Sequence, residues 1–170
     1  MASRLVTYCC DANVFLAWLG EEATAPLGDI DLVFGEIDRK VASLLVPVTA
    51  YSEVLEARHT PAQMEKFRRL LDRSNVVVAD TTKTIAERAG LIRSRGIEAK
   101  PRRIIKTPDA TFMATAIIYR ATVFHTLETT QLPGLSGTDI VDKLVITAPK
   151  PWSSTPSMFN PDPGEPKRPS

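Results

Sequence analysis

Four acidic residues stand where an apolar run has just ended or where a helical pattern begins. They are Asp11 in CCDANVF, Glu53 in TAYSEVLEA, Asp109 in TPDATFMATAII and Glu128 in VFHTLE. Carboxylates brought together repel one another and take up protons unless a cation compensates their charge. All-oxygen ligands favour hard cations such as Mg²⁺ or Mn²⁺, and metal-bound water ionises readily enough to hydrolyse a phosphodiester. The four acids are therefore a candidate catalytic set.

These acids can meet only if the chain folds into a sheet whose strands end at one edge. Short β-prone runs alternate with amphipathic helical segments, which is typical of an α/β protein with a parallel sheet. The runs cover residues 5–10, 43–49, 75–79, 121–124 and 143–146. Because the carboxyl ends of parallel strands share one edge, where ligands bind, we expect the four acids to converge there.

Two helices are the clearest of the amphipathic segments. In 60–72, Thr60 and Gln63 form a capping-box pattern at the first turn. In 82–95, apolar residues repeat on one face, and Gly96 is predicted to end the helix as a C-cap. The residues that follow Gly96 are then expected to form a loop that leads to the next helix.

The composition predicts one domain with a tail. A chain of 170 residues that is 44% hydrophobic can bury one full core, and the proline-rich end suggests a domain over 1–148 and a tail over 149–170. Cys9 and Cys10 are adjacent in a strand and are interpreted as buried thiols. The absence of a long apolar run and of a signal-peptide pattern predicts a cytoplasmic protein that does not enter a membrane.

Each acid also has a plainer interpretation. Asp is common as a helix cap, so Asp11 alone would pass for one, and Asp109 alone would pass for a cap or for a first-turn acid after a Thr107 cap. Glu53 alone is more often a solvated helix residue, and Glu56, one turn later, competes for any role given to it. Only the joint pattern favours a functional site.

The blocks DANVFLAWL, TAYSEVLEA, DATFMATAI and TVFHTLE, in this order and at these separations, resemble the signature blocks of PIN-domain ribonucleases, in particular the VapC-type toxins of toxin-antitoxin pairs. The resemblance covers about residues 4–147. It implies a PIN-like three-layer α/β/α fold with a mostly parallel sheet of about five strands. It also implies an endoribonuclease that depends on Mg²⁺ or Mn²⁺, with RNA as substrate, an antitoxin as partner and a homodimeric state.

The resemblance also implies roles for individual residues. Asp11 and Asp109 match acids that bind metal directly or through water, and Glu53 matches a ligand or an orienter of the attacking water. Glu128 stands at the place of a fourth acid and is assigned to the metal as well. The family pattern at this block reads like TxDxDF, whereas this chain has TLETTQL, with a longer acid and no second Asp.

Two polar residues near these acids match auxiliary positions of the family. Asn13 lies two residues after the first acid, and Thr126 lies two residues before Glu128. The resemblance implies that Thr126 helps to position water or metal.

Binding of RNA requires cations near the phosphates, and the net charge of +1 provides no overall field. The best local source is the stretch KPRRIIK, immediately before the Asp109 helix. Its basic residues, which we treat as RNA-binding candidates, are Lys100, Arg102, Arg103 and Lys106.

Two other classes of protein remain open at this point. A degenerate PIN-like module would bind RNA or a protein without cutting, and the TLETTQL block favours it. A phosphohydrolase with an aspartyl nucleophile also places an acid after the first strand, but it needs a second Asp two residues later, where this chain has Asn13.

Overall fold

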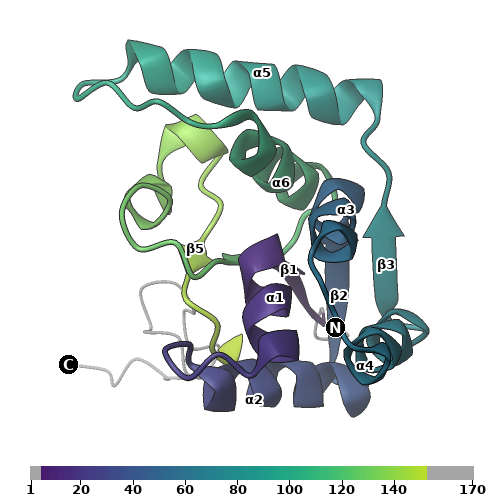
Figure 1. Ribbon diagram of the computed structural model, residues 1–170. Helices are drawn as coiled ribbons and strands as arrows, with labels where there is room; N and C mark the ends of the chain where they lie inside the picture. The colour runs from purple at the N-terminus through teal and green to yellow at the C-terminus, as the bar shows by residue number, and fades with distance from the viewer. Residues whose placement is uncertain (1–4, 153–170) are drawn as a thin grey trace, which may run out of the picture.

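The computed structural model describes residues 5–152, and residues 1–4 and 153–170 lie outside the described part. Five parallel strands form one sheet in the order β3-β2-β1-β4-β5, with β1 in the middle (Figure 1). The strands are β1 (Val6–Cys10), β2 (Ala42–Pro47), β3 (Val76–Ala79), β4 (Val123–His125) and β5 (Ile146–Thr147). The predicted α/β class is confirmed, and the sheet is parallel throughout.

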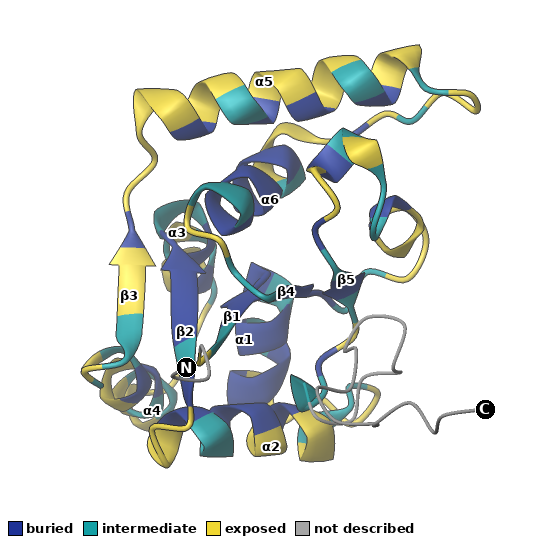
Figure 2. Ribbon diagram, turned by 180° about the vertical axis from the view of Figure 1, so that it is seen from behind, coloured by how far each residue is buried: buried dark blue, intermediate teal, exposed yellow. Residues whose placement is uncertain are grey.

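Helices cover both faces of this sheet and produce three α/β/α layers. They are α1 (Ala12–Gly20), α2 (Leu27–Asp38), α3 (Val48–Glu56), α4 (Pro61–Leu71), α5 (Lys83–Glu98) and α6 (Thr107–Ile118). Buried residues of α1, α2 and α4 share one core, whereas those of α5 and α6 share the other. α6 is buried almost all round beneath α5, whose outer face is exposed (Figure 2). Within residues 5–152, no helix is both long and apolar enough to cross a membrane.

The central strand β1 is apolar because both of its faces are covered. Tyr8 and Cys10 point into the core shared with α1, whereas Cys9 points into the core shared with α6. Both cysteines are fully buried free thiols, as predicted, and burial raises the pKa of each. Such a strand cannot accommodate a charge until it leaves the sheet, and the first residue after it is Asp11.

The predicted capping box at the start of α4 is confirmed. The Gln63 amide donates to the Thr60 hydroxyl oxygen at 3.2 Å, and the Thr60 amide donates to the Gln63 side-chain oxygen at 2.8 Å. These reciprocal bonds satisfy two backbone donors that the first helical turn would otherwise leave free.

The predicted end of α5 was wrong, and Thr107 is not the cap of α6. Helix α5 continues through Gly96 to Glu98, and a Cβ at Gly96 would lie 2.9 Å from the carbonyl oxygen of Arg103. The Arg103 amide donates to the Gly96 carbonyl at 2.8 Å, so the glycine allows a close backbone approach and does not end the helix. At α6 the N-cap position is Lys106, and Thr107 lies inside the first turn.

The last strand begins later than predicted. The sequence favoured residues 143–146, but β5 covers Ile146–Thr147. Asp142 and Lys143 both have left-handed backbone angles, with φ of 50° and 65°. A strand needs extended angles, so this pair of residues turns the chain before β5 can start.

The first residues of the predicted tail contact the domain. The Trp152 amide donates to the Tyr8 hydroxyl at 2.8 Å, and the Trp152 side chain packs beside the core shared with α1 and α2. The boundary at residue 148 stays a prediction, and the tail beyond residue 152 lies outside the described residues.

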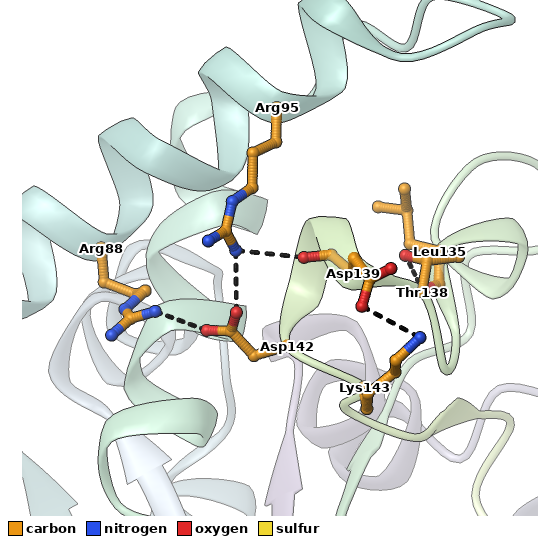
Figure 3. Close-up of polar contacts among 7 residues, drawn as sticks. All are labelled: Arg88, Arg95, Leu135, Thr138, Asp139, Asp142 and Lys143. Atoms are coloured by element: carbon orange, nitrogen blue, oxygen red, sulfur yellow. Dashed lines mark hydrogen bonds and ion pairs between the residues drawn. The ribbon is translucent and has the colours of Figure 1, made fainter.

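Two arginines of α5 hold the short 3-10 helix η2 (Asp139–Val141) against the domain (Figure 3). Arg88 Nη1 lies 2.5 Å from Asp142 Oδ2, and Arg95 Nη1 lies 2.7 Å from Asp142 Oδ1. Arg95 also donates to the Asp139 carbonyl at 3.0 Å. One half-exposed carboxylate therefore connects α5 to the segment that leads into β5.

Substitution Asp142→Asn is expected to lower the free energy of unfolding by about 1 kcal/mol, because it keeps a side chain that tolerates left-handed angles but removes the charge shared by two arginines. Urea denaturation measures the change. Asp139→Asn is the matched control, because the Asp139 side chain is 92% exposed and, within residues 5–152, forms an ion pair only with Lys143. Equal losses in the two variants would contradict a specific role for Asp142.

Candidate metal-binding and catalytic site

The carboxyl edge of the three middle strands brings the predicted acids together from separate elements. Asp11 directly follows β1, Glu53 lies on α3, which starts where β2 ends, and Glu128 follows β4. Asp109 comes from the first turn of α6, which follows a loop and not a strand. Because β1 lies between β2 and β4, Asp11 occupies the centre of this edge.

Asp11 is buried and hydrogen-bonded by both predicted auxiliary residues. It is only 5% exposed. Its Oδ2 accepts a hydrogen bond of 2.8 Å from the Thr126 hydroxyl and one of 3.1 Å from the Asn13 side-chain amide. The Asn13 side-chain oxygen in turn accepts from the Leu127 amide at 3.1 Å. Asn13 and Thr126 thus fix the position of the carboxylate and tie α1 to the segment after β4.

Asp11 occupies the N-cap position of α1, but its side chain makes no capping hydrogen bond. Its backbone amide donates to the His125 carbonyl at 2.9 Å, which extends the hydrogen bonding between β1 and β4 by one residue. The simple interpretation of Asp11 as a helix cap therefore does not describe how its carboxylate is used.

Burial and repulsion from a neighbouring acid raise the pKa of three of the acids. Burial is the main cause of the raised pKa of Asp11, with added repulsion from Glu128, whereas the Thr126 hydrogen bond and the amides of residues 12 and 13 act against it. Burial also raises the pKa of Glu53, followed by repulsion from Asp11 and Asp109. The pKa of Asp109 is raised by burial, by Asp11 and by Glu128, whereas Lys106 lowers it. This part of the molecule therefore concentrates negative charge.

The chemistry of these donors fits a hard divalent cation, because such a cation prefers carboxylate oxygens and would compensate their repulsion. Within residues 5–152, no three His, Cys, Asp or Glu side chains are grouped closely enough to hold a metal ion as they stand. The charge of Asp11 acts on Glu53 and Asp109, but the three side chains do not converge on one point.

Glu128 differs from the other three acids because its side chain folds back onto its own loop. Its carboxylate accepts from the amides of Thr130 at 2.7 Å, Leu132 at 2.7 Å and Gln131 at 2.9 Å, and also from the Thr130 hydroxyl. Burial raises the pKa of Glu128, but these hydrogen bonds outweigh that effect and lower the pKa to about 2. Glu128 therefore carries a full negative charge that is already satisfied by hydrogen bonds.

The predicted basic residues lie in different surroundings. Lys106 lowers the pKa of Asp109, so its charge is felt at the acid group. The Arg103 guanidinium lies beside Gly134, where a Cβ would come within 2.9 Å of Nη1. Lys100 and Arg102 are exposed on the connection between α5 and α6. Of these four residues, Lys106 is the one with an electrostatic link to the site.

A groove of about 840 Å³ lies beside Glu128 and was not anticipated from the sequence. Asn13, Thr126 and Glu128 line it together with the connection between α1 and α2. The lining residues of that connection are Glu22, Thr24, Ala25 and Pro26. Their types predict a loop, but they do not predict that the loop lies beside Glu128.

These features define a three-layer α/β/α protein with a group of acids at the carboxyl edge of its central strand. The PIN domain profile matches residues 8–131, most of the described chain, and the chain belongs to the PIN domain family. The family membership predicted from the four sequence blocks is thereby confirmed.

Solved structures share this fold at low sequence identity. A chain of VapBC2 from Rickettsia felis, bound to a DNA fragment from the promoter, is 15% identical with a TM-score of 0.58 and covers 83% of this chain and 97% of that chain. A toxin-antitoxin complex from Klebsiella pneumoniae is 19% identical with a TM-score of 0.55, covering 75% and 92%. FitAcB from Neisseria gonorrhoeae is 13% identical with a TM-score of 0.54, covering 84% and 97%. Among curated proteins, none matches the sequence.

In the metal-free protein, Glu53→Gln is expected to raise the free energy of unfolding at about pH 7.5 by up to about 1 kcal/mol, because it removes one of the mutually repelling carboxylates from a partly solvated site. The native pKa of Glu53 is raised, so the native state binds more protons than the unfolded state, and stability falls as the pH rises through that window. The gain should vanish below about pH 4, where the carboxyl is protonated in both states.

Urea denaturation in EDTA at the two pH values measures this gain. Glu56→Gln is the matched control, because Glu56 is exposed at the end of the same helix and is only the last of the contributors to the pKa of Glu53. A gain of equal size in Glu56→Gln, or one that persists at low pH, would contradict the account.

Proposed function

We propose that this protein is a metal-dependent endoribonuclease that hydrolyses RNA phosphodiester bonds and is the toxin of a toxin-antitoxin pair. The observation that carries the proposal is the buried Asp11 carboxylate, held by Asn13 and Thr126, whose charge raises the pKa of two further acids, Glu53 and Asp109. Such a concentration of negative charge at a ligand-binding edge is suited to Mg²⁺ or Mn²⁺.

Family membership supports the nuclease part, since PIN domains are generally nucleases that use divalent metals. The similar solved structures support an antitoxin partner, since they include VapBC2 and a toxin-antitoxin complex. At identities below 20% these structures share the fold with this chain, and the antitoxin and a homodimeric state belong to the proposal.

Asp11 and Asp109 would hold the cation, directly or through water, with Glu128 as an auxiliary acid. A divalent cation at this place supplies charge neutralisation at a phosphoryl group and a lower pKa for bound water. Thr126 and Asn13 keep the Asp11 carboxylate in one orientation, and their hydrogen bonds favour its ionised form. Glu53, on the neighbouring helix α3, would bind the cation or orient the attacking water.

Binding of RNA to a nearly neutral protein needs local cations. Lys106 is placed to contact a phosphate beside Asp109, because its charge already acts on that carboxyl. Lys100, Arg102 and Arg103 on the same connection would contact phosphates farther along the strand.

The single most informative experiment is cleavage of a mixed RNA pool with Mg²⁺ or Mn²⁺. Asp109→Asn is expected to lower kcat by at least about 100-fold, because one electrostatic contributor to the transition state is lost. Asp29→Asn is the matched control, since Asp29 is also an acid in the first turn of a helix, on α2. Cleavage that persists in EDTA, or that Asp109→Asn leaves unchanged, would refute the proposal.

A second candidate is a PIN module that binds without cutting. The observations that favour it are the engaged Glu128 carboxylate and the lack of a close metal-ligating group within residues 5–152. Calorimetric titration with Mn²⁺ separates the two candidates, because a nuclease releases or absorbs heat on binding and Asp11→Asn abolishes that heat. Absence of a heat of Mn²⁺ binding in both the wild type and Asp11→Asn would favour the module that binds without cutting.

A further inference from the structure

We propose that Glu128 is a positioning residue that holds the segment 126–132 in place, and that it is not a fourth metal ligand. The inference rests on the proposed function for the identity of the site and sharpens it. The metal would then be held by Asp11, Asp109 and, where it is a ligand, Glu53.

Both oxygens of Glu128 are already occupied by backbone donors. Oε1 accepts from the amides of Thr130 and Gln131 at 2.7 and 3.1 Å, and Oε2 accepts from those of Leu132 and Gln131 at 2.7 and 2.9 Å. Rotation of the carboxylate toward Asp11 would release three amides at once. The amide of Leu132, a residue that is only 2% exposed, would lose its partner where water is scarce, and an unsatisfied buried donor is costly.

The segment that Glu128 holds also orients Asp11. The Glu128 amide donates to the Thr126 hydroxyl oxygen at 3.1 Å, and that hydroxyl donates to Asp11. At the other end, Leu132 packs in the core shared with α6. Glu128 therefore connects the hydrogen bonds around Asp11 to the hydrophobic core at Leu132. Part of the same segment lines the groove.

The length of the side chain suits this role. Glu128 reaches an amide four residues ahead, at Leu132, and an Asp would be one methylene shorter. Thr130, at the place where the resembling pattern has a second Asp, donates through both its amide and its hydroxyl to Glu128. A carboxylate at residue 130 would repel Glu128, so the TLETTQL block is consistent with a loop fastened by one acid.

Hydrogen exchange of the full-length protein tests the anchoring role. In Glu128→Asp, the amides of residues 130–132 are expected to exchange at least about tenfold faster than in wild type, because charge-assisted bonds from those amides are lost or lengthened. Thr130→Val removes the hydroxyl donor alone and should accelerate the same amides less. Asp139→Asn, a change of an exposed acid on η2, should leave them unchanged. Unaltered exchange in Glu128→Asp would overturn the proposal.

Titration with Mn²⁺ tests the claim that Glu128 is not a metal ligand. Glu128→Asp keeps a carboxylate but shortens it, so an anchoring role predicts that Glu128→Asp and Glu128→Gln weaken Mn²⁺ binding to a similar degree, by up to about tenfold, through the segment that orients Asp11. A larger loss in Glu128→Gln that Glu128→Asp restores would identify a ligand and overturn the proposal. If wild type binds no Mn²⁺, the proposed function fails, and the exchange rates alone decide whether Glu128 anchors the segment.

Discussion

Burial of one carboxylate at the end of the central strand is the constraint on which the site depends. Asp11 is 5% exposed, and removing an ionised carboxylate from water is costly unless hydrogen bonds or opposite charges compensate. Thr126 and Asn13 supply two such bonds, and the backbone of Asp11 continues the pairing of β1 with β4. The carboxylate is thereby held by side chains at the point where the backbone hydrogen bonding between β1 and β4 ends.

The strand order explains why the other acids reach this place. Since β1 has β2 on one side and β4 on the other, the elements that follow those strands flank Asp11. Glu53 arrives on α3 and Thr126 arrives at the end of β4. Asp109 lies instead on α6, which packs beneath α5 (Figure 1). Its position depends on the connection between these two helices, which the hydrogen bond from Arg103 to Gly96 holds against α5.

The acids of this edge have two distinct electrostatic states. Burial and neighbouring carboxylates raise the pKa of Asp11, Glu53 and Asp109, so the charged form of each is destabilised. Glu128 is instead stabilised in its charged form by amides of its own loop. Under the proposed function, the first three acids are the residues available to a cation.

The sequence by itself determined the class of fold, the capping box of α4 and the placement of Asp11 and Glu53 at one edge, because each follows from local periodicity or from the shared carboxyl edge of parallel strands. It misplaced the end of α5, because Gly96 lies inside the helix and contacts the backbone of Arg103. It also misplaced the start of β5, because Asp142 and Lys143 have left-handed backbone angles before the strand. Only the tertiary structure decided which polar groups hold Asp11. Thr126 lies 115 positions away, and no sequence pattern specifies a hydrogen bond whose partners meet only after the strands have been ordered in the sheet.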